Sequence, residues 1–269
     1  MLYARAVDHF AVDLGQPHPP GYLFYVLAAR LASSWTADAN AGLVLVSVIS
    51  GGLTCAAGYV IGRRYTGAAG GVFAAAILAT NPLLWQYSEV AYPYATLAFL
   101  TGALGALLWW ARRGGPAAPV GVSLALGAAA GFRQDVLLLG GLWLYVVTRH
   151  GWRATAAAAV AGAVGCLAWL IPTAAQSGGL STYLGTVHSQ FAGVSGAGVL
   201  DPGVIGQNAG GTIAGLRAQV GWTWPLLALG VWVAIRQRRV PLTFLLLWIG
   251  PPLALYLVGH IGEWGYTLS

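Results

Sequence analysis

The sequence has very little charge and almost no cysteine. Asp, Glu, Lys and Arg make up 7% of its 269 residues, against roughly 25% in a typical soluble domain. Lysine is absent, so all 13 basic residues are arginines, whereas hydrophobic residues account for 58% and there are 39 glycines. This balance excludes an ordinary water-soluble domain. The two cysteines, Cys55 and Cys166, lie within apolar runs and exclude a disulfide scaffold.

Long apolar stretches indicate membrane-spanning helices when they approach ~20 residues. Eight stretches cover approximately residues 41–61, 67–80, 92–110, 118–132, 135–148, 154–173, 212–235 and 240–258. A ninth, Pro19 to Trp35, carries Arg30, and its path is left open. The stretches 118–132 and 135–148 correspond to only ~20 Å of helix each, so they predict a tilted or broken hairpin. The predicted fold is a single all-α domain over residues 1–269, a polytopic transmembrane bundle of about eight to nine helices.

The arginines predict how this bundle is oriented, because cytoplasmic loops are enriched in basic residues. With the stretches above, the clusters 63–64, 112–113, 149–153 and 236–239 fall on one side of the membrane, which we assign to the cytoplasm. The opposite, outer side then holds residues 1–40, 81–91, 133–135, 174–211 and 259–269. We expect 1–40 to be a first outer loop with a juxtamembrane helix, and 174–211 to be a further outer loop.

Every acidic residue falls on the predicted outer side. These are Asp8, Asp13, Asp38, Glu89, Asp135, Asp201 and Glu263. One explanation is simply that acidic residues occupy loops from which arginines are excluded. That explanation is weaker for Glu89 and Asp135, which end hydrophobic helices, where an ionised group usually faces a wet cavity or a partner.

The predicted topology also leads to an expectation about the two ends of the chain. Residues 1–40 are predicted to be outside, yet no basic segment followed by an apolar run precedes them as a signal peptide. We therefore expect a spanning helix upstream of Met1, and a continuation beyond Ser269.

The segment Asp8 to Tyr25 is the richest in polar chemistry. Its prolines favour extended backbone and Gly21 permits a sharp turn, so His18 is presented at the start of an apolar helix. The alternative is an interfacial loop that is anchored by its aromatic residues.

Four motifs in the sequence resemble those of a known family. They are HPPGY at 18–22, the apolar helix ending in GRRYTG, NPLLWQYSEVAYPYA at 81–95 and GFRQD at 131–135. With them the chain resembles, over most of its length, the polytopic GT-C glycosyltransferases, the bacterial relatives of protein O-mannosyltransferases and of lipid A aminoarabinose transferases. The resemblance implies transfer of a sugar from a polyprenyl-phosphate carrier to a lipid, glycan or protein acceptor on the outer face of the bacterial cytoplasmic membrane.

The resemblance also implies particular residues. His18 and Arg133 match positions near the donor phosphate, and Glu89 matches a carboxylate of the second outer loop. The family's most characteristic carboxylate would fall just before Met1, so Asp8 and Asp13 lie downstream of it.

Sugar transfer requires a base for the acceptor proton and positive charge or hydrogen-bond donors for the departing phosphate. Candidate bases are Asp8, Asp13 and Glu89, whereas His18 and Arg133 suit the phosphate. Arg133 could instead form a buried ion pair with Asp135 or Glu89. Candidate substrate-binding residues are Tyr92, Tyr94, Glu263 and Tyr266.

Other partners and functions are less defined. A divalent metal is possible, but no ligands stand at a tight spacing such as His-x-x-x-His, and no cofactor is assigned. The expected partners are the sugar donor and membrane lipids, not nucleic acid, and the oligomeric state is open. A secondary transporter and a catalytically inactive membrane scaffold are the alternative functions. Against a transporter, we find no internal repeat or paired broken helices.

Overall fold

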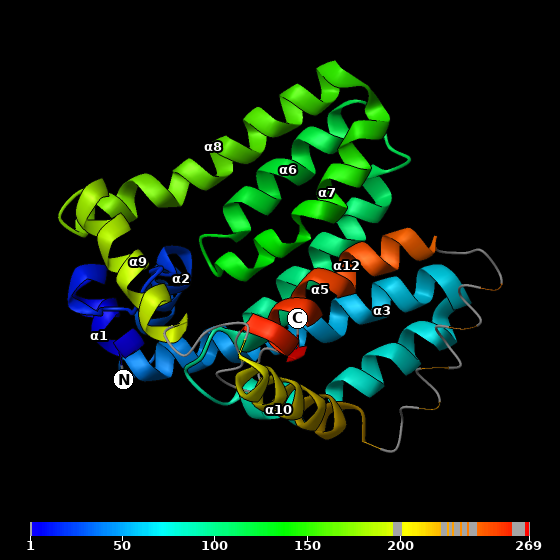
Figure 1. Ribbon diagram of the computed structural model, residues 1–269. Helices are drawn as coiled ribbons and strands as arrows, with labels where there is room; N and C mark the ends of the chain where they lie inside the picture. The colour runs from blue at the N-terminus through cyan, green and yellow to red at the C-terminus, as the bar shows by residue number, and fades with distance from the viewer. Residues whose placement is uncertain are drawn as a thin grey trace.

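The computed structural model describes residues 2–195, 201–221, 241–259 and 267–268, together with residues 225, 228, 232 and 236. Over these residues the protein is all-α, as predicted, but with eleven α-helices in place of eight to nine. Figure 1 shows their arrangement. In chain order they are α1 (Leu2–Asp8), α2 (Leu23–Ser33), α3 (Ala39–Ala79), α4 (Pro82–Ser88), α5 (Tyr94–Ala111), α6 (Ala117–Ala129), α7 (Gly140–Val147), α8 (Trp152–Gln176), α9 (Leu180–Ser195), α10 (Pro202–Val220) and α12 (Leu242–Ala254).

Helix α3 contains both of the first two predicted stretches. It is bent at Gly67, whose φ of 79° lies in the left-handed region that favours glycine. The two halves run back along each other (Figure 1). A Cβ atom on Gly62 would lie 2.7 Å from the Gly70 carbonyl oxygen, so glycines permit this close packing. The predicted pair of apolar segments is confirmed, with Arg63 and Arg64 beside the bend.

The predicted broken hairpin at 118–148 is also present. Helix α6 has 13 residues, and it is followed by the 3₁₀ helix η2 (Gln134–Leu139) and by α7 with 8 residues. Helix α6 packs along α8 through small residues. A Cβ atom on Gly165 would lie 2.5 Å from the Leu124 carbonyl oxygen, and the Trp169 indole donates a hydrogen bond to the Gly127 carbonyl oxygen at 3.1 Å. Helix α8 thereby supports the short α6 along its length.

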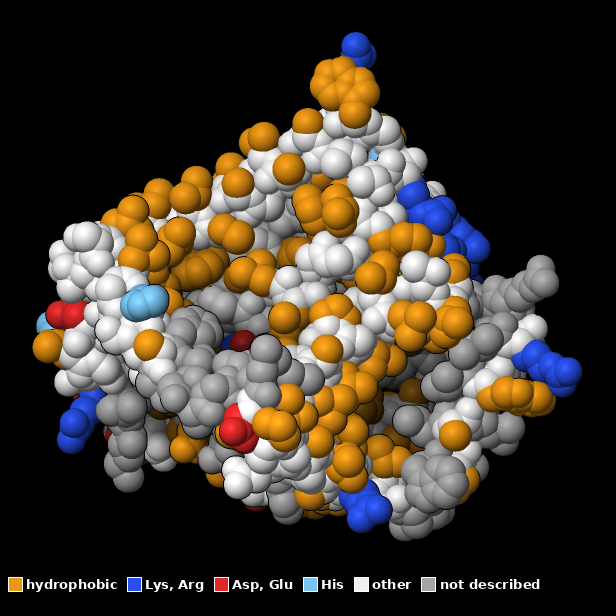
Figure 2. Space-filling view, in the orientation of Figure 1, with side chains coloured by type: hydrophobic (Ala, Val, Ile, Leu, Met, Phe, Trp, Pro, Cys, Tyr) orange, Lys and Arg blue, Asp and Glu red, His pale blue; other side chains and the backbone are white. Residues whose placement is uncertain are grey.

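Three of the described helices, α3, α5 and α8, are long and apolar enough to cross a membrane. Helix α8 also presents an exposed apolar stripe with helical spacing, formed by Val160, Val164, Leu167 and Ile171. Figure 2 shows orange side chains along this helix. A continuous exposed stripe of this kind fits contact with lipid better than contact with water.

Helix α5 connects two chemically different ends of the molecule. With 18 residues it is about 27 Å long, close to the thickness of a bilayer's hydrocarbon core. Arg112 follows its C-terminal end, where His150 contacts the Ala111 carbonyl oxygen at 3.0 Å. Tyr94 begins its other end and packs near Arg133. In Figure 2 the largest group of basic side chains lies at the upper right of the molecule, and single ones lie at the top, right, bottom and left.

The predicted outer loop at 174–211 is mostly helical. It contains α9 and the first half of α10, which begins at Pro202, ten residues before the predicted apolar stretch. Two long-range hydrogen bonds join the α8–α9 region to the N-terminal segment. The Tyr183 hydroxyl donates to the Pro20 carbonyl oxygen at 3.0 Å, and the Val12 amide donates to the Ser177 hydroxyl oxygen at 3.3 Å.

The predicted orientation can be tested with single cysteines. In a background lacking Cys55 and Cys166, Gln86→Cys and Ser181→Cys should react with a membrane-impermeant thiol reagent in intact cells, because both exposed positions lie on the predicted outer side. Gly115→Cys, exposed at the arginine-rich end, should react only after the cells are permeabilised. Equal labelling of all three positions in intact cells would contradict the orientation.

Candidate active site

A cavity of about 470 Å³ lies between α1, the segment at His18, the start of α3 and the segment that joins α4 to α5. We call it the N-terminal cavity. It brings His18 together with Glu89 and Tyr92, which belong to the separate motif at 81–95. Its lining residues are Tyr3, Ala4, His18, Asn40, Leu43, Val44, Glu89, Val90, Ala91 and Tyr92.

The backbone after His18 is held in an unusual conformation. Gly21 has φ 115°, and a Cβ atom there would lie 3.0 Å from side-chain methyl groups of Val12 and Thr173, so the predicted turn requires glycine. Tyr22 follows with φ 50°, a left-handed conformation that is rare for a bulky residue. Such strain costs on the order of 1–3 kcal/mol and tends to occur at functional sites. It places the Tyr22 hydroxyl 3.3 Å from His18 Nε2.

Tyr3 forms the centre of an aromatic cluster beside the cavity. Its ring centroid lies 5.5 Å from that of His18, 5.6 Å from that of Tyr22 and 6.2 Å from that of Tyr92. Burial raises the pKa of the Tyr3 phenol well above its ordinary value. The phenol therefore stays protonated at neutral pH and remains a hydrogen-bond donor at the cavity wall.

His18 is half-buried in this wall. Burial, and secondly the positive charge of Arg133, lower the pKa of the imidazole below its ordinary value of 6.5. The ring is therefore neutral at pH 7 and carries one N–H donor. Acidification through the lowered pKa would add a second donor and a positive charge.

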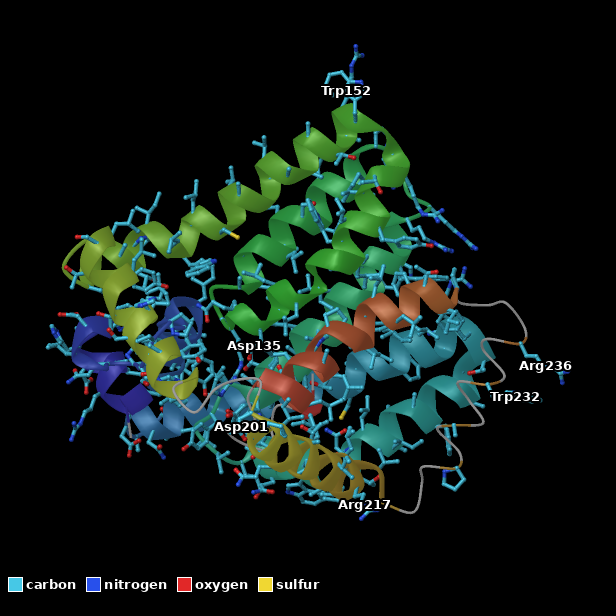
Figure 3. The ribbon with its side chains drawn as sticks, in the orientation of Figure 1. Asp135, Trp152, Asp201, Arg217, Trp232 and Arg236 are labelled. Carbon is cyan, nitrogen blue, oxygen red and sulfur yellow. The ribbon has the colours of Figure 1, made fainter. Side chains whose placement is uncertain are left out.

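Arg133 lies behind the cavity and is only 2% exposed. Its Nε donates to Asp135 Oδ2 at 2.6 Å, and its guanidinium carbon lies 4.5 Å from the centroid of the Tyr94 ring and 5.7 Å from that of Tyr22. Of the two ion pairs considered from the sequence, the structure contains the one with Asp135. Figure 3 shows Asp135 beyond the lower end of α7. Arg133 does not line the cavity. Its positive charge therefore affects the cavity electrostatically, across the residues that line it.

Glu89 is the carboxylate that the cavity contains. It follows the last residue of α4, is exposed, and accepts a hydrogen bond from the Trp85 indole. It also lines a neighbouring pocket of about 300 Å³ with Trp85 and Ser88. A carboxylate that accepts the Trp85 hydrogen bond and lines the cavity can accept a proton from a bound molecule.

The other predicted site residues lie elsewhere. Asp8 ends α1, Asp13 lies in the short helix η1 (Val12–Leu14), and both are exposed and absent from the cavity lining. Tyr94 is buried behind Tyr92. Glu263 and Tyr266 lie outside the described residues. Within the described ranges, no three His, Cys, Asp or Glu side chains come together as a metal-binding group.

Sequence reasoning missed three residues of this site. Tyr3 and Asn40 line the cavity and Tyr22 hydrogen-bonds to His18, but none was singled out. Tyr22 belongs to the quoted HPPGY motif, so its position next to His18 was the available signal. Tyr3 and Asn40 reach the cavity only through tertiary packing.

A third pocket, of about 300 Å³, is almost wholly apolar and lies between α2, α3 and α5. We call it the apolar pocket. Phe132, the chain neighbour of Arg133, forms part of its wall with Leu31, Trp35, Val46, Ile49, Leu53, Phe99 and Leu100. Apolar surface thus extends from the outside of the bundle to the residue next to the buried arginine.

Comparison of the chain with protein-family models, curated proteins and solved structures gives no match.

Proposed function

We propose that the protein is a GT-C-type glycosyltransferase of the bacterial cytoplasmic membrane, with its site on the outer face. It would transfer a sugar from a polyprenyl-phosphate carrier to a lipid, glycan or protein acceptor. The observation that carries the proposal is the N-terminal cavity. It combines an accessible carboxylate, a histidine and aromatic rings at the end of an apolar bundle opposite to its arginine clusters.

The reaction assigns a role to each polar group. Glu89 takes the proton of the acceptor hydroxyl as its oxygen bonds to the anomeric carbon of the sugar. The bond from that carbon to the phosphate oxygen breaks, and polyprenyl phosphate leaves with the electron pair. The His18 N–H donates a hydrogen bond to the departing phosphate, and the buried charge of Arg133 stabilises the negative charge that develops there.

The aromatic residues of the N-terminal cavity suit the sugar of the donor, and the apolar pocket suits its carrier lipid. Tyr92, 45% exposed, and Tyr3 offer ring faces and a phenol to a sugar. The apolar pocket suits the first isoprene units of the carrier, because it is nearly free of polar surface and includes Phe132. Asp8 and Asp13 receive no role in this mechanism, because they lie away from the cavity.

Carrier binding tests this proposal without knowledge of the sugar. In nanodiscs, undecaprenyl phosphate should bind at least tenfold more tightly than undecaprenol, which lacks the phosphate. His18→Ala should reduce this preference about tenfold, since hydrogen bonds to charged groups contribute roughly 1.5–3 kcal/mol. His188→Ala, which removes an exposed histidine on α9 outside the cavity lining, should have no effect. Equal binding of the two lipids would contradict the proposal.

A further inference from the structure

The arginine-rich end of the molecule carries positive charge that no described acidic side chain neutralises. Arg64, Arg112 and Arg113 come from α3 and the turn after α5, and all three lie within electrostatic range of Tyr65. Within the part of the chain that the structure describes, the ion pair between Arg133 and Asp135 at the opposite end is the only one. The sequence between residues 222 and 240 contains no Asp or Glu. We therefore expect the counter-charge to come from outside the chain.

Trp109 holds two of these arginines in place. The Arg112 guanidinium carbon lies 4.1 Å from its ring centroid and that of Arg113 lies 5.7 Å away. The Arg112 Nε atom is buried and has no hydrogen-bond partner among the described residues. A buried cationic donor without an acceptor is costly, which favours an acceptor supplied by a ligand.

An apolar pocket of about 200 Å³ lies directly beside this cluster, between α3, α5 and α12. Its wall includes Arg64, Tyr65, Trp109, Trp110, Phe244 and Trp248. Figure 1 shows α12 lying beside α3 and α5. The site thus has a cationic rim and an aromatic interior, beside the bend of α3 and the C-terminal end of α5, two helices that can cross a membrane.

We propose that this second site binds an anionic phospholipid of the cytoplasmic leaflet. Its phosphate would contact Arg64 and Arg112, and the upper part of an acyl chain would fill the aromatic pocket. A free phosphate ion would satisfy the arginines but leave the aromatic pocket empty, whereas a zwitterionic lipid would bring its own positive charge to the cluster. Basic pockets between transmembrane helices on the cytoplasmic side recognise anionic headgroups in this way.

Lipid retention by the full chain tests the proposal. Protein purified in detergent with equal amounts of phosphatidylglycerol and phosphatidylcholine of identical acyl chains should retain phosphatidylglycerol selectively, as measured by native mass spectrometry. Arg64→Gln and Arg112→Gln should each reduce that selectivity about fivefold. The matched control is Arg153→Gln, which removes an exposed arginine stacked on Trp152 at the start of α8 and should leave the selectivity unchanged.

Three outcomes would overturn the proposal. The first is equal retention of the two lipids by the unmodified protein. The second is an equal loss of selectivity in Arg153→Gln and Arg112→Gln, which would indicate a general charge effect. The third is displacement of the bound phosphatidylglycerol by millimolar inorganic phosphate, which would identify a site for the free anion. Since neither substitution touches the N-terminal cavity, carrier binding measured on the same variants should be unchanged.

Discussion

Replacing Glu89 with glutamine is expected to lower sugar transfer by a factor of about 10² to 10⁴, because the substitution keeps the side chain's shape and removes the base. Glu89 is the carboxylate that lines the N-terminal cavity, and its main described contact is the Trp85 indole, whose donated hydrogen bond a glutamine oxygen can still accept. Binding of undecaprenyl phosphate should therefore remain within about twofold of the unmodified protein. Single-turnover transfer and carrier binding on one preparation separate these two effects.

Asp8→Asn and Asp13→Asn are the matched controls for this prediction. Each removes one carboxylate from the predicted outer side, but both positions are exposed and lie outside the cavity lining. Both variants should retain nearly full transfer. If either abolishes transfer while Glu89→Gln does not, the acceptor proton is taken by the first-loop aspartate, and Glu89 is not the base.

Arg133→Met is expected to destabilise the folded protein by about 1.5–3 kcal/mol, the usual contribution of a hydrogen bond to a charged group, because Arg133 is buried whereas the Asp135 side chain stays 26% exposed. The substitution leaves the Asp135 carboxylate without its cation and removes the charge that stacks on Tyr94. Unfolding in mixed micelles of increasing denaturing detergent, followed by tryptophan fluorescence, measures this loss.

The double variant Arg133→Met with Asp135→Asn removes both charges and should recover most of the lost stability. Arg153→Met removes an exposed arginine at the other end and should change stability by less than about 0.5 kcal/mol. If the single and double variants unfold at the same detergent fraction, the unpaired Asp135 carboxylate is not the source of the lost stability.

Much of the helical framework could be predicted from the sequence because it depends on local patterns. Apolar run length located α5 and α8 within a few residues, and the two runs separated by Arg63 and Arg64 located the bend of α3. The short apolar stretches on either side of Arg133 predicted the broken hairpin. The turn at Gly21 followed from its place after two prolines, and its positive φ bears this out.

The candidate site could be predicted only in part, because it depends on contacts between distant segments. The charge pattern placed His18, Glu89 and Arg133 at one end of the molecule but could not show that Arg133 is buried behind the cavity wall and paired with Asp135. The charge pattern also could not show which of the candidate bases, Asp13 or Glu89, lines the cavity. Tyr3 could not be predicted as a site residue, because a single tyrosine in a seven-residue helix carries no local signal of a binding site.

The most direct test of the proposed function is the release of free polyprenyl phosphate from sugar-loaded carriers. Membranes containing the protein would be supplied with undecaprenyl-phosphate mannose, glucose or aminoarabinose, and released undecaprenyl phosphate would be quantified by mass spectrometry. The proposal predicts release from at least one donor, dependent on a cell-envelope acceptor fraction and lowered by Glu89→Gln. Binding of the carriers with no release from any donor, and no difference between the protein and Glu89→Gln, would contradict it and favour an inactive scaffold.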